Sequence, residues 1–161
     1  MRFLSPDMRA DRVWDIDLPA LTDRGKTALI IDIDNTIVEW GGWVIPKEAR
    51  DWIDRARALG FSMCLLTNNR RPRASHFGRE LGLPVVWGWA KPWAWGFRRA
   101  LHTIGAHPES VVVVGDQVFT DVLGARCAGL EVILVSPFTR KEFFLTRLLR
   151  RLERLASGER R

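Results

Sequence analysis

The stretch from Thr27 to Trp40 reads T-A-L-I-I-D-I-D-N-T-I-V-E-W and decides the fold of the chain. An apolar run ending at Ile31 is followed by two acids, Asp32 and Asp34, which is typical of a buried strand carrying charge at its carboxyl end. Ligands bind at that end in open α/β sheets. Residues two apart on a strand share a face, and two buried carboxylates need a cation or hydrogen bonds. The stretch therefore predicts a metal and phosphate site.

Outward from this stretch, strand-like and helix-like segments alternate along the chain. Alternation of this kind predicts an α/β fold, with a mainly parallel sheet covered by helices on both faces. Residues 1–26 read as polar and irregular, although Val13, Trp14, Ile16 and Leu18 could pack on the body, and Val38 to Ile45 reads as a turn or flap. The expected strands are 28–33, 61–66, 85–87, 111–114 and 132–135, and the expected helices are 46–59, 72–81, 92–102 and 118–128.

Length and composition favour one soluble domain over residues 1–161. The chain has 161 residues, of which 47% are hydrophobic and 27% charged, and no apolar run is long enough to cross a membrane. We expect a core over 27–138, an N-terminal extension over 1–26 and a basic amphipathic helix over 139–161. The absence of a secretory signal indicates a cytoplasmic protein, and Cys64 and Cys127 are expected to be buried and reduced.

Polar residues of complementary type follow four of the expected strands. Carboxylate oxygens from several strand ends suit Mg²⁺, and hydroxyl, amide and ammonium groups suit phosphate oxygens. Phosphoryl transfer depends on this combination of positioning and charge neutralisation. The residues concerned are Asp32, Asp34, Thr67, Asn68, Lys91, Asp116 and Asp121.

These motifs together resemble those of the haloacid dehalogenase (HAD) superfamily of phosphatases. The four motifs are D-I-D-N-T, L-L-T-N-N, K-P and G-D-Q-V-F-T-D, in this order. More narrowly, the chain resembles the YqeG type of subfamily IIIA. That group includes the mitochondrial phosphatidylglycerophosphatase, so the resemblance implies phosphatidylglycerophosphate as substrate. It also implies a Rossmann-like sheet of five strands in the order 5-4-1-2-3.

The resemblance also implies a role for each of the residues at the strand ends. Asp32 is the expected nucleophile and forms an aspartyl-phosphate, and Asp34 is the expected general acid and base. Thr67, Asn68 and Lys91 are expected to hold the phosphoryl group. Mg²⁺ is expected on the Asp32 carboxylate, the Asp34 backbone carbonyl and Asp116, with Asp121 in the surrounding shell.

The intervals between the motifs leave no room for a cap domain. The residues between Asp34 and Thr67 are filled by the flap and one helix, and those between Thr67 and Lys91 by one helix and one strand. An uncapped site stays open, which suits a large substrate such as a lipid headgroup, a protein or a nucleic-acid end.

Several features also have a purely structural interpretation. Lys91 could be a surface lysine before a helix, and Asp121 could brace its own helix. The tryptophans could be packing residues, whereas Trp40, Trp43 and Trp89 on loops at the active-site end could touch lipid. The histidines His76, His102 and His107 show no spacing for metal ligands.

The basic segment 139–161 carries eight Lys or Arg and three Glu. It could dock on the sheet, lie on an anionic phospholipid surface at the inner face of the membrane, or bind RNA. A phosphatase for proteins, nucleic-acid ends or sugar phosphates, and an RNA- or ribosome-binding module with incidental hydrolysis, therefore remain alternatives. Zinc-dependent sugar-phosphate relatives are disfavoured, because two isolated cysteines cannot form their site.

Overall fold

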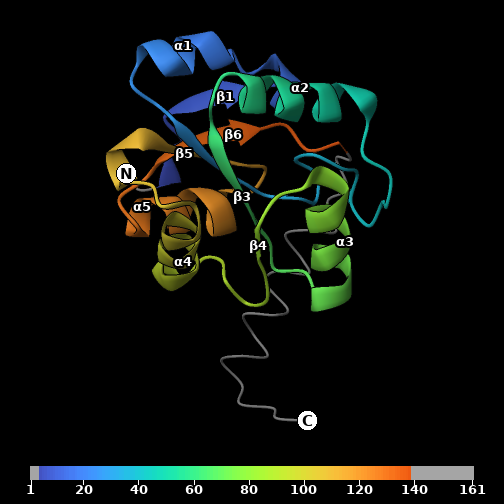
Figure 1. Cartoon of the computed structure of the whole chain (residues 1–161). Helices are drawn as coiled ribbons and strands as arrows, with labels where there is room; N and C mark the ends of the chain where they lie inside the picture. Colours follow the sequence, from blue (N-terminus) through green and yellow to red (C-terminus); the bar gives the residue numbers. More distant parts are fainter. Residues whose placement is uncertain (1–3, 139–161) are drawn as a thin grey trace, which may run out of the picture.

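The computed structural model describes residues 4–138 and contains one six-stranded, wholly parallel sheet. Its order is β1-β6-β5-β2-β3-β4 (Figure 1). The five expected strands thus lie in the expected order, 5-4-1-2-3, and a sixth strand extends the sheet beyond β6. The strands are β1 (Met8–Ala10), β2 (Ala28–Ile31), β3 (Ser62–Leu66), β4 (Val85–Val86), β5 (Val111–Gly115) and β6 (Glu131–Val135).

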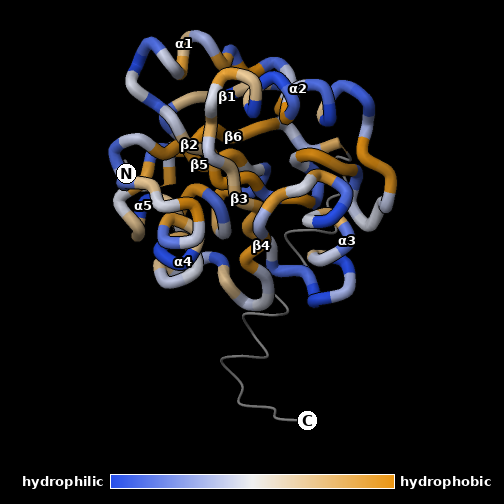
Figure 2. Tube along the Cα trace, in the orientation of Figure 1, coloured by the Kyte–Doolittle hydropathy of each residue, from blue (hydrophilic) through white to orange (hydrophobic). Residues whose placement is uncertain are grey.

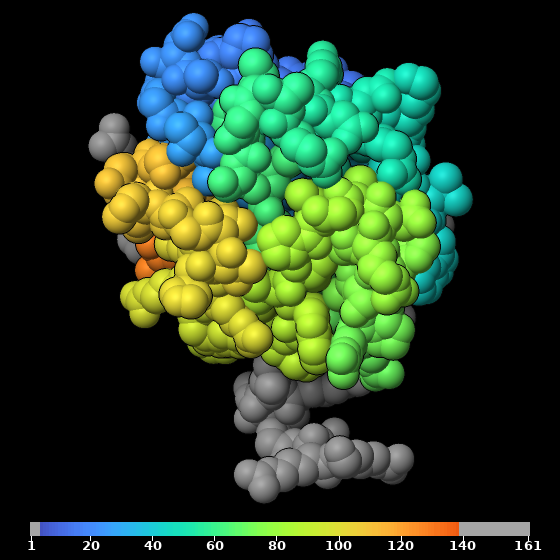
Figure 3. Space-filling model, viewed as in Figure 1, coloured from blue at the N-terminus to red at the C-terminus, as the bar shows by residue number. Residues whose placement is uncertain are grey.

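Helices cover both faces of the sheet, as predicted. Alternate residues of each central strand contribute to two separate hydrophobic clusters, because successive strand side chains point to opposite faces. One cluster packs against α1 (Leu18–Asp23), α2 (Lys47–Ala58) and α3 (Arg71–Leu81), and the other against α4 (Ala94–Ile104) and α5 (Leu123–Cys127). Hydrophobic residues accordingly concentrate on the strands between the helices (Figure 2), and side chains of α2, α3 and α4 close over this side of the molecule (Figure 3).

The N-terminal extension is ordered, so the expectation of an irregular segment is wrong for much of it. β1 pairs with β6, with Met8 opposite Ile133, and is followed by the 3₁₀ turn η2 (Val13–Asp15) and then α1. Val13, Ile16 and Leu18 are buried, as expected. A three-residue edge strand with mostly exposed side chains has no hydrophobic alternation, so the sequence pattern could not reveal it.

Two expected helices differ in detail from those in the structure. Pro92 precedes α4 and lies outside it, because that helix begins at Ala94. The expected helix 118–128 is divided into a π-helical turn, η4 (Val118–Val122), and the short α5. A second 3₁₀ turn, η3 (Pro108–Ser110), leads into β5.

The two cysteines differ in their surroundings. Cys64 is buried in β3, where burial raises the pKa of its thiol to about 11. Cys127 is exposed at the end of α5, so the expectation that both are buried is wrong for this residue. Among residues 4–138, no helix combines the length and apolar character needed to cross a membrane.

Candidate active site

The carboxyl ends of the parallel strands bring together the polar residues singled out in the sequence. Asp32 follows β2 directly, and its backbone N–H donates to Val114 of β5 at 2.9 Å, which continues the sheet pairing. The side chains of Asp32 and Asp34 are only 5% and 11% exposed. Strand pairing therefore buries both carboxylates, and a buried carboxylate needs a hydrogen-bond donor or a cation as its partner.

Lys91 is the principal partner of Asp32 and is buried, not a surface residue. Its Nζ lies 2.6 Å from Asp32 Oδ1 and 2.7 Å from Asp121 Oδ1. Burial alone would lower the pKa of Lys91, but Asp121 and Asp32 together raise it, so the side chain stays an ammonium at neutral pH. A buried cation thus lies between two carboxylates, one at the end of β2 and one in η4.

The pKa values of Asp32 and Asp116 are both raised. Burial is the main cause for Asp32, whose pKa reaches about 7 despite the opposing effect of Lys91. Burial, reinforced by the charges of Asp32 and Asp121, raises the pKa of Asp116 to about 8. Several buried carboxylates close together therefore favour the binding of a proton or of a metal cation.

The donor set fits a hard divalent cation. Carboxylate oxygens of Asp32, Asp116 and Asp121 lie within 4.8 Å of one another. Asp116 Oδ1 is buried and has no hydrogen-bond partner, so an oxygen atom is left available for a ligand. A group of oxygen ligands of this kind is what Mg²⁺ prefers.

Asp121 also braces the end of β5. Its Oδ2 accepts the backbone N–H of Gln117 at 3.1 Å, while its Oδ1 holds Lys91. A Cβ placed on Gly115 would lie 2.3 Å from Asp121 Cγ, so only glycine allows this close approach. The π-helical turn η4 carries Asp121 inward, and such turns are frequent at functional sites.

Thr67 and Asn68 follow β3, and their side chains have different surroundings. Thr67 is 1% exposed, and its Oγ1 accepts the backbone N–H of Asn69 at 3.1 Å, which leaves the hydroxyl proton free to donate. Asn68 uses its side-chain amide to clasp the backbone of Lys91, with two hydrogen bonds of 2.9 Å. A phosphate contact by Asn68 stays a prediction, and with this side chain engaged it would use the backbone N–H.

The carboxylate of Asp34 is hydrogen-bonded by residues that the sequence reasoning missed. Asn69 Nδ2 donates to its Oδ2 at 2.5 Å, and Arg73 Nη2 donates to its Oδ1 at 2.6 Å. The backbone N–H of Gly41, in the flap, also donates to Oδ1 at 3.2 Å. Both oxygens of Asp34 are therefore hydrogen-bonded by the loop after β3, by α3 and by the flap.

Arg73 joins the flap to α3 as well as binding Asp34. Its guanidinium carbon lies 5.1 Å from the ring centroid of Trp43 and 5.0 Å from that of Phe77. Trp43 also packs edge-on against His76. The signal in the sequence was the run T-N-N-R-R-P-R directly after a strand, in which only the first two residues were singled out.

Exposed tryptophans lie in the flap, in the segment around Lys91 and at the start of α4. Trp52 is fully buried and Trp14 partly buried, so the packing interpretation holds for these two. The other tryptophans are between 43% and 60% exposed, in the flap and around Lys91: Trp40, Trp43, Trp87, Trp89, Trp93 and Trp95. Packing thus accounts for some of the tryptophans, and Trp40, Trp43 and Trp89 are exposed, while a contact of these three with lipid stays a prediction.

A family model for haloacid dehalogenase-like hydrolases matches residues 6–129. The chain is 33% identical over 153 residues to the probable phosphatase YqeG of Bacillus subtilis, which covers 95% of this chain and 89% of that protein. It is 25% identical to phosphatidylglycerophosphate phosphatase 1 of Arabidopsis thaliana, but spans only 47% of that protein. These matches confirm the expected resemblance to YqeG-type phosphatases.

Solved structures show the same fold at low identity. A protein from Listeria monocytogenes aligns with a TM-score of 0.59 and 18% identity, over 72% of this chain and 84% of that one. NagD from Escherichia coli aligns with a TM-score of 0.55 and 18% identity, over 68% of this chain and 87% of that one. The expected fold class is confirmed, including its parallel sheet with helices on both faces.

Proposed function

Because the chain belongs to the haloacid dehalogenase-like hydrolases, we propose that it is a Mg²⁺-dependent phosphomonoesterase acting through an aspartyl-phosphate on Asp32. The observation that carries the proposal is the buried Lys91 ammonium between Asp32 and Asp121. It holds a carboxylate oxygen in place beside a cluster of ligands for a hard cation. A positioned nucleophile and compensated charge are the main requirements of phosphoryl transfer.

Asp32 and Asp34 divide the chemistry between them. A carboxylate oxygen of Asp32 forms the bond to phosphorus as the bond to the leaving alcohol breaks, and Asp34 delivers a proton to the departing oxygen. Asp34 then takes a proton from water, whose oxygen attacks phosphorus and releases phosphate from Asp32. In this proposal Asn69 and Arg73 position the Asp34 side chain for its contact with the leaving oxygen and with water.

The remaining polar residues bind and orient the phosphoryl group. The Thr67 hydroxyl and the backbone N–H of Asn68 are proposed donors to its oxygens, and Lys91 offsets its charge. Mg²⁺ would be held by the carboxylates of Asp32 and Asp116 and by the Asp34 carbonyl oxygen, with Asp121 bracing Lys91. The bound cation supplies further neutralisation of negative charge.

We propose phosphatidylglycerophosphate as the substrate. The similarity to the Arabidopsis phosphatidylglycerophosphate phosphatase supports this choice. The absence of a cap among residues 4–138 leaves the strand ends open, as a lipid headgroup requires. Exposed tryptophans around an open site also suit a membrane–water interface, where their amphipathic rings are favoured.

Membrane contact is proposed as peripheral. Anionic lipids would attract basic residues, and the expected basic helix 139–161 is the main candidate. That segment lies outside the described residues. The proposed location is therefore the cytoplasmic side of a membrane. Protein, sugar-phosphate and nucleic-acid substrates are the alternatives to the lipid, and the substrate experiment below distinguishes them.

The nucleophile assignment is tested with Asp32→Asn on an aryl phosphate. We expect hydrolysis to fall by about a thousandfold or more, with an unchanged far-ultraviolet circular dichroism spectrum. Asp23→Asn, at an exposed acid of α1, is the matched control and should retain wild-type turnover. Substantial turnover by Asp32→Asn would refute the assignment.

The substrate is tested by measuring phosphate release from phosphatidylglycerophosphate beside a panel of sugar, nucleotide and phosphopeptide substrates. We expect the lipid to give the highest kcat/KM. A preference for any other member of the panel would refute the lipid proposal, and tight RNA binding without turnover would favour a binding module.

A further inference from the structure

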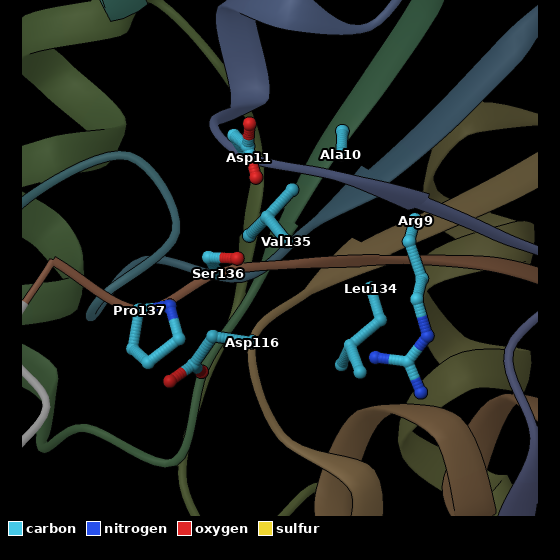
Figure 4. Close-up of a pocket in the computed structure, with 8 residues that line it drawn as sticks. All are labelled: Arg9, Ala10, Asp11, Asp116, Leu134, Val135, Ser136 and Pro137. Carbon is cyan, nitrogen blue, oxygen red and sulfur yellow. The ribbon is translucent and has the colours of Figure 1, made fainter.

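A pocket of about 480 Å³ opens beside Asp116, on the side of the sheet that the N-terminal extension adds. Its lining comes from β1 and β6, from the residues just after each, and from Asp116 after β5: Arg9, Ala10, Asp11, Asp116, Leu134, Val135, Ser136 and Pro137 (Figure 4). The proposed reaction uses Asp116 alone among these. The other lining residues therefore form a space beside Asp116 in which the proposed reaction uses no side chain.

The walls of this pocket are fixed by hydrogen bonds between the N-terminal extension and the end of β6. Ser136 donates its backbone N–H to the Ala10 carbonyl at 3.1 Å. Arg12 donates from Nη1 to the carbonyl oxygens of Ser136 and Pro137, at 2.9 and 3.3 Å. Its guanidinium also lies 4.9 Å from the ring centroid of Phe138. The pocket is thus built into the fold before any ligand arrives.

Arg9 is the cation of this pocket, and its guanidinium has no hydrogen bond or ion pair within residues 4–138. The nearby arginines differ, since Arg12 bonds backbone carbonyls and Arg126 pairs with Asp7. Figure 4 shows Arg9 and Asp116 on opposite sides of Leu134. An unpaired guanidinium that lines a preformed pocket is suited to bind an oxyanion.

The strand register sets the distance between Arg9 and the end of β5, where Asp116 lies. Gly115, Leu134 and Arg9 form one row across β5, β6 and β1. Their Cα atoms therefore span two strand spacings, roughly 10 Å, and the side chains of Arg9 and Leu134 extend from the same side of the sheet (Figure 4). A ligand with one phosphate at Asp32 and a second anionic group near Leu134 could contact both ends of this row.

Asp11 is the one acid of the pocket besides Asp116, and it affects which ligands fit. Figure 4 places its carboxylate away from the Arg9 guanidinium. An acidic side chain repels a second phosphate but accepts hydrogen bonds from hydroxyl groups, and Ser136 adds a hydroxyl of its own. The lining therefore favours an anion at one end and hydroxyl-bearing carbon atoms elsewhere.

We propose that this pocket is a subsite for a second anionic group of the substrate, with Arg9 as the specificity-determining residue. The inference rests on the proposed phosphatase function and narrows its substrates to phosphomonoesters joined, through a short hydroxylated linker, to another anion. A phosphodiester of a lipid headgroup and a second phosphate of a bisphosphorylated sugar share this chemistry. The pocket volume, within the range of about 300–1,000 Å³ usual for small-ligand sites, accommodates either.

The test compares Arg9→Gln with wild type in the full-length chain. Two pairs of substrates are used: the deacylated phosphatidylglycerophosphate headgroup beside glycerol 3-phosphate, and fructose 1,6-bisphosphate beside fructose 6-phosphate. The measured quantity is the ratio of kcat/KM for each two-anion substrate to its one-anion partner. We expect wild type to prefer two anions and Arg9→Gln to reduce that preference about tenfold, since one charge-assisted contact is lost.

Hydrolysis of an aryl phosphate should be unchanged in Arg9→Gln, because this substrate has no second anion. Arg98→Gln removes the same charge from the exposed surface of α4, outside the pocket, and should leave every ratio at the wild-type value. Calorimetric titration of the uncleaved headgroup into Asp32→Asn, with and without Arg9→Gln, gives the loss of affinity directly. Higher salt should weaken the affinity more where Arg9 is present than in Arg9→Gln.

A wild-type ratio near one would overturn the subsite. An equal loss on one-anion and two-anion substrates, or an equal effect of Arg98→Gln, would overturn it as well. A preference for the bisphosphorylated sugar that depends on Arg9 would support the subsite and refute the lipid substrate. A preference for the headgroup that is independent of Arg9 would support the lipid and refute the subsite.

Discussion

Replacing Lys91 by methionine tests how the active-site carboxylates are held together. The variant removes the ammonium that contacts Asp32 and Asp121 at 2.6 and 2.7 Å and keeps a side chain of similar length. The Lys91 side chain is 4% exposed, so water cannot replace the lost partner. Two buried carboxylates are left without their cation.

The expected loss of stability is large. Removing one member of a buried ion pair costs about 3–5 kcal/mol, because the remaining charge stays dehydrated. For a chain of this size, such a loss lowers Tm on the order of 10 °C. Domains are stable by about 5–15 kcal/mol in total, so the variant should remain folded at room temperature but with a reduced margin.

The loss should depend on pH in a definite direction. The pKa of Asp32 in the folded protein, about 7, is above its unfolded value of 3.8, so folding binds a proton between these values. Stability therefore falls as pH rises through this window. Loss of Lys91 raises the pKa of Asp32 further, so at pH 5.5 the acid is neutral and the penalty is smaller than at pH 8.

Urea unfolding followed by circular dichroism, in EDTA at both pH values, measures these differences. Lys47→Met is the matched control, because Lys47 pairs with Asp51 on the surface with its side chain 82% exposed. We expect no measurable change in that control. A loss in Lys91→Met that is equal at pH 5.5 and pH 8, or no greater than in the control, would refute the reasoning.

Three further predictions concern the same region. In EDTA, the wild-type Tm should fall between pH 5 and pH 8, because the pKa values of Asp32 and Asp116 are raised. Adding Mg²⁺ should raise the Tm more at pH 8 than at pH 5, and an equal rise at both pH values would contradict a cation on the carboxylate oxygens. Gly115→Ala should cost about 1–3 kcal/mol in urea unfolding and lower activity, because its Cβ would strike Asp121; wild-type values would show that the loop yields freely. Arg73→Lys should lower kcat on an aryl phosphate about tenfold, because lysine cannot both stack on Trp43 and hold the Asp34 carboxylate. Arg70→Lys, at an exposed arginine, is the control and should keep the wild-type kcat. Equal kcat values in the two variants would refute the role of Arg73 as a positioning residue.

Much of the fold and the composition of the site could be predicted from local patterns. The run from Ala28 to Ile31 is apolar because a central parallel strand is buried on both faces, and all four residues are indeed buried. Polar residues follow the strands because parallel strands end at one edge, so a linear pattern was enough to bring Asp32, Lys91 and Asp116 together. The sheet order came from the family resemblance, since periodicity gives no strand neighbours.

The orientation of side chains within the site could not be read from those patterns. Asn68 and Asn69 are chemically identical neighbours, yet one clasps the Lys91 backbone and the other holds the Asp34 carboxylate. Which contact each makes depends on the loop path after β3, and therefore on tertiary packing. The place of Asp121 was equally open, because a carboxylate on a helix can brace that helix or turn inward.

The sequence by itself determined the chemical groups of the site and the edge of the sheet on which they meet, because a buried strand is recognisable from its own apolar residues and the polar residues that follow it. Only the tertiary structure decided what lies next to that site. Met8–Ala10 is too short and too exposed to show a periodic pattern, and it becomes a strand because β6 offers unpaired backbone groups. That long-range pairing places Arg9 in the pocket beside Asp116.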